Sequence, residues 1–421
     1  TCALPISGLY INSSGAATFI NNGSGNFVAG GSSNAGAGIV ISGASVLFNN
    51  SGSGNMSIAG ASTSSGLGVS GVVINTTASD FINSGAGNYS VTGYSNGTSP
   101  GAAALLISSA RTNFTTSSSG CLSLSGVSNA GEGVAIAGNV SNFVASGVGG
   151  DLQIFGTSTG GGLGINISGN TSNFSNIGEG NFNITGISQG SGAGQSGVLI
   201  NNVLSSTFAN SGNSSYVIAG YSNGGSAGVA GLRLNSNVSN YTNIANGSFS
   251  IAGASNVGFG VNLTGNTSRF TNSGGGNLSL AGSAQGSGAV GVSVNSAVSG
   301  NFINNGTGNL TIRGSSNASS GIAITGPLTN FTSNGSGGLS ILGTSNAGEG
   351  VLVAGNQSNF IASSAGNLTI LGTSVGGGVG VNISGNFSNF TNSGTGTFNL
   401  TGTSNSSGAG ASGVVINNAN T

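Results

Sequence analysis

Apolar residues recur along the chain in short segments, and within each segment they lie two positions apart. Residues 308–314 (GNLTIRG) are typical, because Leu310 and Ile312 flank the polar Thr311. The same spacing recurs at Met56/Ile58, Tyr89/Val91, Leu122/Leu124, Leu152/Ile154, Phe182/Ile184, Leu278/Leu280, Leu368/Ile370 and Phe398/Leu400. Two is the period of a β-strand, so we expect both apolar side chains to face a core and the residue between them to face water.

Two further segment types accompany this one. One is typified by residues 260–266 (GVNLTGN), in which Val261 and Leu263 again lie two apart, and the other by residues 172–174 (SNF). Clusters of Gly, Ser and Asn separate the segments, as in residues 272–277 (NSGGGN). Such clusters supply sharp corners. Each repeat therefore predicts three short strands joined by three corners.

The repeat is counted most easily from its aromatic residue. Neighbouring aromatics lie about 29 to about 34 residues apart, which gives thirteen units after Ile6: Phe19, Phe48, Phe81, Phe114, Phe143, Phe174, Phe208, Tyr241, Phe270, Phe302, Phe331, Phe360 and Phe390. A longer period is also present, because residues 129–139 (NAGEGVAIAGN) return about 217 residues later as residues 346–356 (NAGEGVLVAGN). Duplication of a seven-unit block explains it, as in other arrays whose units contact only their neighbours.

These patterns predict an all-β fold, a right-handed single-stranded parallel β-helix (β-solenoid) of about 13 coils of about 30 residues with three short strands per coil. The aromatic and the paired aliphatic residues are expected to stack inside. Asn277, Asn309 and Asn367 are expected to form a side-chain ladder at one corner, which satisfies polar groups there. Gly interrupts every helical period, which excludes an α-solenoid.

The ends of the chain carry separate expectations. Residues 1–6 (TCALPI) fit no repeat and match the translation of a sequencing-adapter end, so we expect them to be adapter-derived or a non-repeat start. Residues 7–421 are expected to form one continuous solenoid domain that is truncated at both ends, because the last unit stops just before its next aromatic.

The composition of the chain excludes some classes of binding partner. Only 2% of the 421 residues are charged, and the four cationic side chains are Arg111, Arg233, Arg269 and Arg313. Nucleic acids and anionic membrane surfaces require clustered Lys or Arg, so neither is an expected partner. No apolar run is long enough for a transmembrane helix. Hydrophobic residues reach 36% and recur at fixed places, which argues against a disordered Gly-rich segment.

The residues that catalysis needs are scarce. The chain has no His, and its five carboxylates are spread over the repeats: Asp80, Glu132, Asp151, Glu179 and Glu349. Ser-His-Asp and Cys-His sites are therefore impossible, and no pair of carboxylates shares a coil. Residues 147–151 (GVGGD) occur once, unlike a calcium-binding repeat, and zinc would need His or several Cys. We predict no catalytic, cofactor-binding or metal-binding residue and expect that the protein is not an enzyme.

The sequence also bears on two covalent modifications. Cys2 and Cys121 lie about four coils apart in the repeat, too far for a disulfide. Cys121 is expected to be a small buried residue that replaces Asn at a turn. Glycosylation sequons are numerous. The regular set at Asn113, Asn173, Asn240, Asn330 and Asn389 should point away from the buried aromatic, which suggests glycosylation along one side of the solenoid.

The pattern GVxIxGN–SNFxNSGxGNLxIxGxS resembles the repeat regions of bacterial filamentous-haemagglutinin-like exoproteins and autotransporter passengers. The resemblance covers nearly the whole chain and lies in the style of the repeat. It implies export, a right-handed β-helix and adhesion to cells or glycans. The amino-terminal secretion domain with its Asn-Pro-x-Gly signatures and the carboxy-terminal barrel are not found in the sequence, so the secretion route stays open.

We therefore expect a non-catalytic, secreted or cell-surface, structural or adhesive solenoid (an adhesin passenger or stalk), extracellular and associated with the outer membrane if bacterial. A host-cell or glycan surface is the expected partner, with self-association along the solenoid. Outward apolar residues such as Val73, Leu199, Leu352 and Val415 would supply adhesive patches.

Two alternatives remain. An ice- or surface-binding solenoid would need a regular Thr array; Thr311 and Thr369 fit it, but equivalent coils carry Ser, Gln or Asn. A polysaccharide-active β-helix enzyme is disfavoured by the scattered carboxylates.

Overall fold

The computed structural model describes residues 7–66, 69–98, 102–190, 195–225, 229–405 and 411–418. These residues form a parallel β-solenoid of about 13 turns of about 30 residues, which confirms the predicted fold class. The expectation for residues 1–6, Cys2 included, lies outside the described residues. The described part of the chain contains no helical segment with the length and hydropathy needed to cross a bilayer.

The chain divides into two compact units. Unit 1 comprises Thr1–Ser206 with Ser214–Gly220, and unit 2 comprises Thr207–Asn213 with Tyr221–Thr421. Two strands contribute residues to both units, β14 (Val198–Asn210) and β15 (Tyr216–Ser222).

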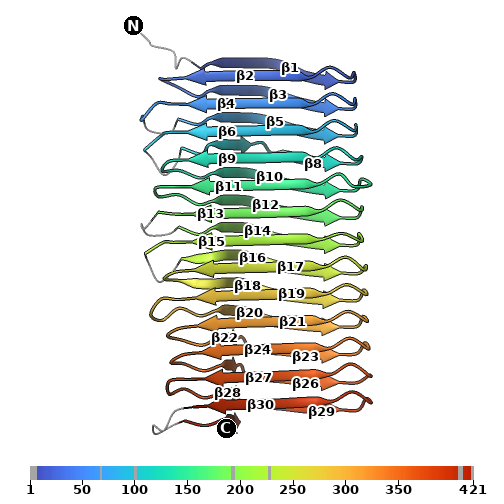
Figure 1. The fold of residues 1–421 in the computed structure, drawn as a ribbon, viewed down its shortest axis with the longest axis vertical. Helices are drawn as coiled ribbons and strands as arrows, with labels where there is room; N and C mark the ends of the chain where they lie inside the picture. Colours follow the sequence, from blue (N-terminus) through green and yellow to red (C-terminus); the bar gives the residue numbers. More distant parts are fainter. Residues whose placement is uncertain are drawn as a thin grey trace. The chain divides into compact units, whose positions relative to one another are not determined.

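Each unit is built from two parallel sheets, A and B, whose strands alternate along the chain (Figure 1). In unit 1, sheet A contains β1 (Leu9–Asn21), β3 (Ile39–Asn50), β5 (Val72–Asn83), β7 (Leu105–Ser108), β8 (Arg111–Thr116), β10 (Val134–Ala145) and β12 (Ile165–Asn176). Sheet B of unit 1 contains β2 (Phe27–Ser33), β4 (Met56–Ser62), β6 (Tyr89–Ser95), β9 (Leu122–Ser128), β11 (Leu152–Ser158) and β13 (Phe182–Ser188).

Unit 2 repeats this arrangement. Its sheet A contains β16 (Ala230–Asn243), β18 (Phe259–Asn272), β20 (Val292–Asn304), β22 (Ile322–Thr325), β23 (Leu328–Ser333), β25 (Val351–Ala354), β26 (Gln357–Ala362), β28 (Val381–Gly385), β29 (Phe387–Asn392) and β31 (Val414–Asn418). Its sheet B contains β17 (Phe249–Ser255), β19 (Leu278–Ala284), β21 (Leu310–Ser316), β24 (Leu339–Ser345), β27 (Leu368–Ser374) and β30 (Phe398–Ser404).

The three predicted segments of each repeat are all strands, but they lie in two sheets. The first and second segments share sheet A, and in β5 they form one strand with a kink after Thr76. Thr77 and Ala78 both face outward there, which shifts the alternation by one residue before Ser79 turns inward again. The strand is also continuous in β1, β3, β10, β12, β14, β16, β18 and β20, so these turns have two strands and not the predicted three. The kink divides the strand between β7 and β8, β22 and β23, β25 and β26, and β28 and β29. Sheet A is therefore bent, and sheet B faces its inner side.

Equivalent residues of successive turns pair directly. Phe48 of β3 pairs with Phe81 of β5, and Met56 of β4 pairs with Tyr89 of β6. The repeated aromatics consequently stack in a column inside each unit, with ring centroids 4.7 to 5.4 Å apart from Phe19 to Phe174. In unit 2 the spacing is 4.3 to 5.1 Å from Phe208 to Phe390. The predicted aromatic interior is confirmed, and such offset stacks add to the burial of apolar surface.

Glycine sets the distance between the sheets at the side opposite the aromatic column. Gly343 of β24 faces the chain just before β25, and a Cβ on Gly343 would overlap the carbonyl oxygen of Gly350. Gly126 of β9 meets Gly133 in the same way in unit 1. The recurring Gly of the third segment is thus required by a close approach of two backbones.

Candidate functional site

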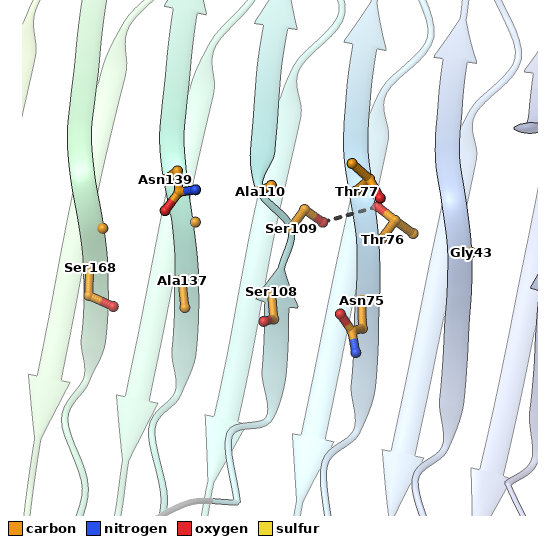
Figure 2. Close-up of a pocket in the computed structure, with 12 residues that line it drawn as sticks. Gly43, Asn75, Thr76, Thr77, Ser108, Ser109, Ala110, Ala137, Asn139 and Ser168 are labelled. Atoms are coloured by element: carbon orange, nitrogen blue, oxygen red, sulfur yellow. Dashed lines mark hydrogen bonds between the residues drawn. The ribbon is translucent and has the colours of Figure 1, made fainter.

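The outer face of sheet A is hollowed along its kink, and this groove is the candidate functional site (Figure 2). Because successive kinks lie side by side, the groove crosses the strands of five turns in unit 1. Its volume is about 580 Å³, and it is lined by Gly43, Asn75, Thr76, Thr77, Ser108, Ser109, Ala110, Ala137, Gly138, Asn139, Ser168 and Gly169. We call it the kink groove. Its lining residues are small or polar, and none carries a charge.

Five of the lining side chains offer unused hydrogen-bonding groups: Asn75, Thr77, Ser108, Asn139 and Ser168. They lie at outward positions or in the bend itself, and in the described structure none forms a side-chain hydrogen bond. The amides of Asn75 and Asn139 are exposed to solvent. The groove therefore presents donors and acceptors that the fold does not use.

The floor of the groove is fixed by buried hydroxyl groups. Thr76 Oγ1 lies 2.7 Å from Ser79 Oγ and 3.1 Å from Ser109 Oγ, and the two Ser hydroxyls lie 2.8 Å apart. Figure 2 marks the bond between Thr76 and Ser109. Because these hydroxyls pair with one another across two turns, they hold the kinks of β5 and of the β7–β8 segment in register.

A ladder of side-chain hydrogen bonds lies beside the groove on the same face. In unit 1, Asn113 Nδ2 donates to Asp80 Oδ1 (2.6 Å), Asn142 Nδ2 to Asn113 Oδ1 (2.8 Å) and Asn173 Nδ2 to Asn142 Oδ1 (2.9 Å). The first rung also holds an ion pair, because Arg111 lies 3.3 Å from Asp80. We call this the outer ladder. In unit 2 it joins Asn301, Asn330, Asn359 and Asn389.

A second ladder is buried beside the aromatic column. Asn50 Nδ2 donates to Asn83 Oδ1 (3.1 Å) in unit 1, and Asn210, Asn243, Asn272 and Asn304 form a continuous series in unit 2. At the end of the ladder, the amide donates to a backbone carbonyl instead, as Asn304 Nδ2 does to the carbonyl oxygen of Gly338 (2.9 Å). The buried amide groups therefore bond to one another or to backbone carbonyls without any charge, although Asn50 Oδ1 has no partner in the described structure.

The side-chain ladder predicted from the sequence, at Asn277, Asn309 and Asn367, is not one of these two ladders. Asn277 and Asn309 do connect turns, but each side-chain oxygen accepts a backbone N–H of the next turn, from Asn309 (2.9 Å) and Gly338 (2.9 Å) respectively. Asn367 accepts the N–H of Thr397 in the same way (2.8 Å). The two true side-chain ladders were missed. Their signals were the recurrent Asn before the aromatic and the recurrent Asn two residues after it.

The five carboxylates lie at separate places in the fold, and Glu179 is exposed at the corner before β13. Asp80 pairs with Arg111 on sheet A, Asp151 accepts the backbone N–H of Asn181 (2.8 Å) at a corner, and Glu349 accepts the hydroxyl of Ser320 (2.9 Å). Burial raises the pKa of Glu132 above its usual value, although hydrogen bonds from its own backbone and from Asn166 oppose the shift. Among the described residues, no three His, Cys, Asp or Glu lie close enough together to hold a metal.

Apolar side chains are exposed on the outer face of sheet B in unit 1. Tyr94, Val127 and Phe155 are 44%, 36% and 39% exposed. Tyr94 pairs with Val127, and Phe155 lies one turn further on, diagonal to Val127. We call these three residues the sheet B strip. The sequence pointed instead to Val73, Leu199, Leu352 and Val415, which face outward but are half-buried.

A polar hollow and a free thiol lie elsewhere on the surface. In unit 2, a hollow of about 400 Å³ on sheet B is lined by Ser, Asn and Thr residues, by Leu280 and Ala281, and by Arg313. Cys121 is a free thiol at a corner of unit 1, where its backbone N–H donates to Asn88 Oδ1 (3.0 Å). It occupies the Asn position of the corner, as the sequence predicted, but it is half-buried and not buried as expected.

The chain matches no protein-family model, no curated protein and no solved structure. Its function must therefore be inferred from the fold and from the geometry of these surfaces.

Proposed function

We propose that the protein is a non-catalytic structural and adhesive solenoid, secreted or displayed at a cell surface, and that it binds cell or glycan surfaces through its outer faces. The proposal agrees with the resemblance of the repeat to haemagglutinin-like and autotransporter regions. It is also supported by the low charge of the chain and by the wide separation of its five carboxylates. Self-association along the solenoid remains part of the proposal.

The main support for an adhesive role is the register between neighbouring turns. Equivalent residues of neighbouring turns lie in register, so any side chain that repeats at an outward position becomes a row on the surface. In the kink groove, hydrogen-bonding side chains of four successive turns lie close together, although Ala137 interrupts the column that contains Ser108 and Ser168. In the sheet B strip, Tyr94 and Val127 occupy one column and Phe155 lies in the next column. Rows of weak contacts suit attachment to an extended surface, where many small contributions add by multivalency.

Adhesion tests the proposal directly. Beads carrying the purified chain should be retained on cells or on glycan-coated surfaces, and retention should fall when the strip is made polar in a Tyr94→Ser/Phe155→Ser variant. A chain with the same repeat style but scrambled outward residues is the control. Retention no greater than that of uncoated beads on every surface would refute an adhesive role. Release of reducing sugars from polysaccharides by the purified chain would refute the non-catalytic part.

Binding to ice or another crystal surface is a second candidate, favoured by one observation in unit 2. Thr344, Thr373 and Thr403 occupy one outward column of sheet B on adjacent strands. The column that contains Thr369 is broken, because Ser340 and Asn399 lie on either side of it. Thermal hysteresis that disappears in a Thr373→Lys variant would support this candidate, and the absence of hysteresis in the unmodified chain would exclude it.

A further inference from the structure

We propose that the kink groove binds a linear, uncharged polysaccharide whose chain lies along the groove and crosses the strands of successive turns. This inference rests on the proposed adhesive function and specifies its ligand class and its site. The groove spans about 20 Å, since it covers four steps of about 4.8 Å between neighbouring strands. Its volume of about 580 Å³ falls in the range of small-ligand sites. A short stretch of a polysaccharide fits these dimensions.

The chemistry of the lining selects a neutral ligand rich in hydroxyl groups. Each of four consecutive turns brings an amide or a hydroxyl side chain to the groove: Asn75, Ser108, Asn139 and Ser168. Asn139 lies two residues beyond Ala137, which is the residue of its turn that pairs with Ser108 and Ser168. Each of these groups both donates and accepts hydrogen bonds, as a sugar hydroxyl does. The nearest charges belong to Arg111 and Asp80, and these neutralise each other in an ion pair. An acidic polysaccharide would find no cation in the groove to pair with.

The contrast with the rest of sheet A indicates that these side chains are available. On the neighbouring outer ladder, each amide is used by the next turn, as between Asn142 and Asn113. Asn75 and Asn139 stand on the same face, a few residues away in the same strands, and their amides bond to nothing in the described structure. At the position equivalent to Asn75 in the preceding turn, Ser42 does bond to the turn before it, through Asn12 Oδ1 (3.3 Å). Asn75 and Asn139 form no such bond in the described structure, so their hydrogen-bonding capacity remains for a ligand.

A peptide ligand fits the groove less well. Extended peptides bind sheets by adding a strand at an edge, where backbone groups are unpaired. On both sides of the kink the backbone groups of sheet A already bond between turns, so the groove offers no continuous strand edge for a peptide to extend. The lining also lacks a large apolar or aromatic side chain, which a peptide anchor would need. The same lack predicts weak binding per sugar, with affinity that grows as more turns are engaged.

The test uses the full chain and neutral linear glucan and mannan oligosaccharides of graded length, with polygalacturonate as the acidic comparison. Calorimetry or affinity electrophoresis should show affinity for a neutral oligosaccharide that rises with length and changes little with salt. Ala110→Trp places a bulky ring in the groove and should lower affinity about tenfold or more, because several hydrogen bonds are lost. Ala59→Trp, at an exposed outward position of sheet B, is the matched control and should bind normally.

A second variant distinguishes a loss of binding from a loss of folding. Asn75→Ala/Asn139→Ala removes two exposed amides without adding bulk, and it should lower affinity severalfold while leaving the circular dichroism spectrum unchanged. Binding of no neutral oligosaccharide, or equal binding by the groove variants and by Ala59→Trp, would overturn the groove site. If bead adhesion persists in that case, the proposed adhesive function stands without the groove. If the unmodified chain binds oligosaccharides but does not retain beads, the adhesive function fails and the groove remains.

Discussion

The hydroxyl of Tyr89 is a polar group in the core that no other group satisfies. Its ring is fully buried, and its hydroxyl has no hydrogen-bond partner in the described structure. The residues that pair with it on either side are Met56 and Leu122, whose side chains carry no oxygen or nitrogen acceptor. A buried hydroxyl without a partner costs free energy because it gives up its bond to water.

We therefore predict that Tyr89→Phe stabilises the protein by about 1 kcal/mol, since the ring packing is kept. Burial also raises the pKa of Tyr89 well above its usual value of 10.0. The folded protein should then lose stability as the pH rises above that value, and the variant should lose less. Urea unfolding at neutral and alkaline pH measures both effects. Tyr94→Phe, at an exposed position of the same strand, is the control, and a destabilised Tyr89→Phe would contradict the argument.

Glu132 gives a prediction in the acidic range. Burial raises its pKa above the usual value of 4.5, so the folded protein favours the protonated carboxyl. The contribution of Glu132 to stability is then complete below that value and is lost as the pH rises through the folded pKa. Glu132→Gln should be more stable than the unmodified protein at neutral pH, and the difference should vanish in acid. Thermal unfolding across this range measures it, and a difference that grows in acid would contradict it.

At the scale of the strand, the close approach of the sheets makes one glycine position intolerant of any side chain. A Cβ on Gly343 would overlap the carbonyl oxygen of Gly350, a backbone atom that cannot turn away. Gly343→Ala should destabilise by about 1–3 kcal/mol or more, as overpacking does. Gly30 faces outward in sheet B, and a Cβ there meets nothing within 4 Å, so Gly30→Ala is the control. Equal effects of the two substitutions on urea unfolding would show that the sheets are not in contact at Gly343.

The outer ladder changes the expectation for glycosylation. An N-linked glycan attaches to the Asn side-chain nitrogen, and Nδ2 of Asn330 donates to Asn301 Oδ1 at 2.8 Å. Asn305 also lies in a sequon but is exposed at a corner, where its side chain accepts a bond through Oδ1 from Asn334. When the folded protein is treated with an oligosaccharyltransferase, Asn305 should be modified and Asn330 should not. Glycopeptide mass spectrometry reads both sites, and modification of Asn330 in protein that keeps its β-sheet signal would contradict the ladder.

The strands also show which features of the fold could be predicted from the sequence and which could not. Alternation at Leu310 and Ile312 was enough to predict which side chains are buried, because a strand has only two faces. The kink at Thr76 could not be distinguished from a corner, since both use small polar residues and Gly. What separates them is whether the sheet continues through the bend, which depends on pairing between turns. The kink groove and the two side-chain ladders depend on that pairing, so the sequence of one repeat did not predict them.

At the scale of the whole molecule, the stability of a solenoid should be the sum of its turns and of the contacts between adjacent turns. Within unit 2, Asn305 and Asn334 begin equivalent corners, and Asn334 Nδ2 bonds to the side chain of Asn305 in the turn before. Deletion of residues 305–333 removes one complete turn and joins equivalent positions. Phe302 would then stack on Phe360, a contact of the same kind as its present one with Phe331.

The shortened chain should therefore fold, with an unchanged β-sheet spectrum and a modest loss of stability. Deletion of residues 305–318 is the matched alternative, because it removes β21 and leaves two sheet A segments in succession with no sheet B strand between them. That variant should lose cooperative unfolding, since every later turn would be half a turn out of register. Circular dichroism and thermal unfolding compare the two deletions. A whole-turn deletion that unfolds the chain would mean that particular residues, and not the repeated register, specify this fold.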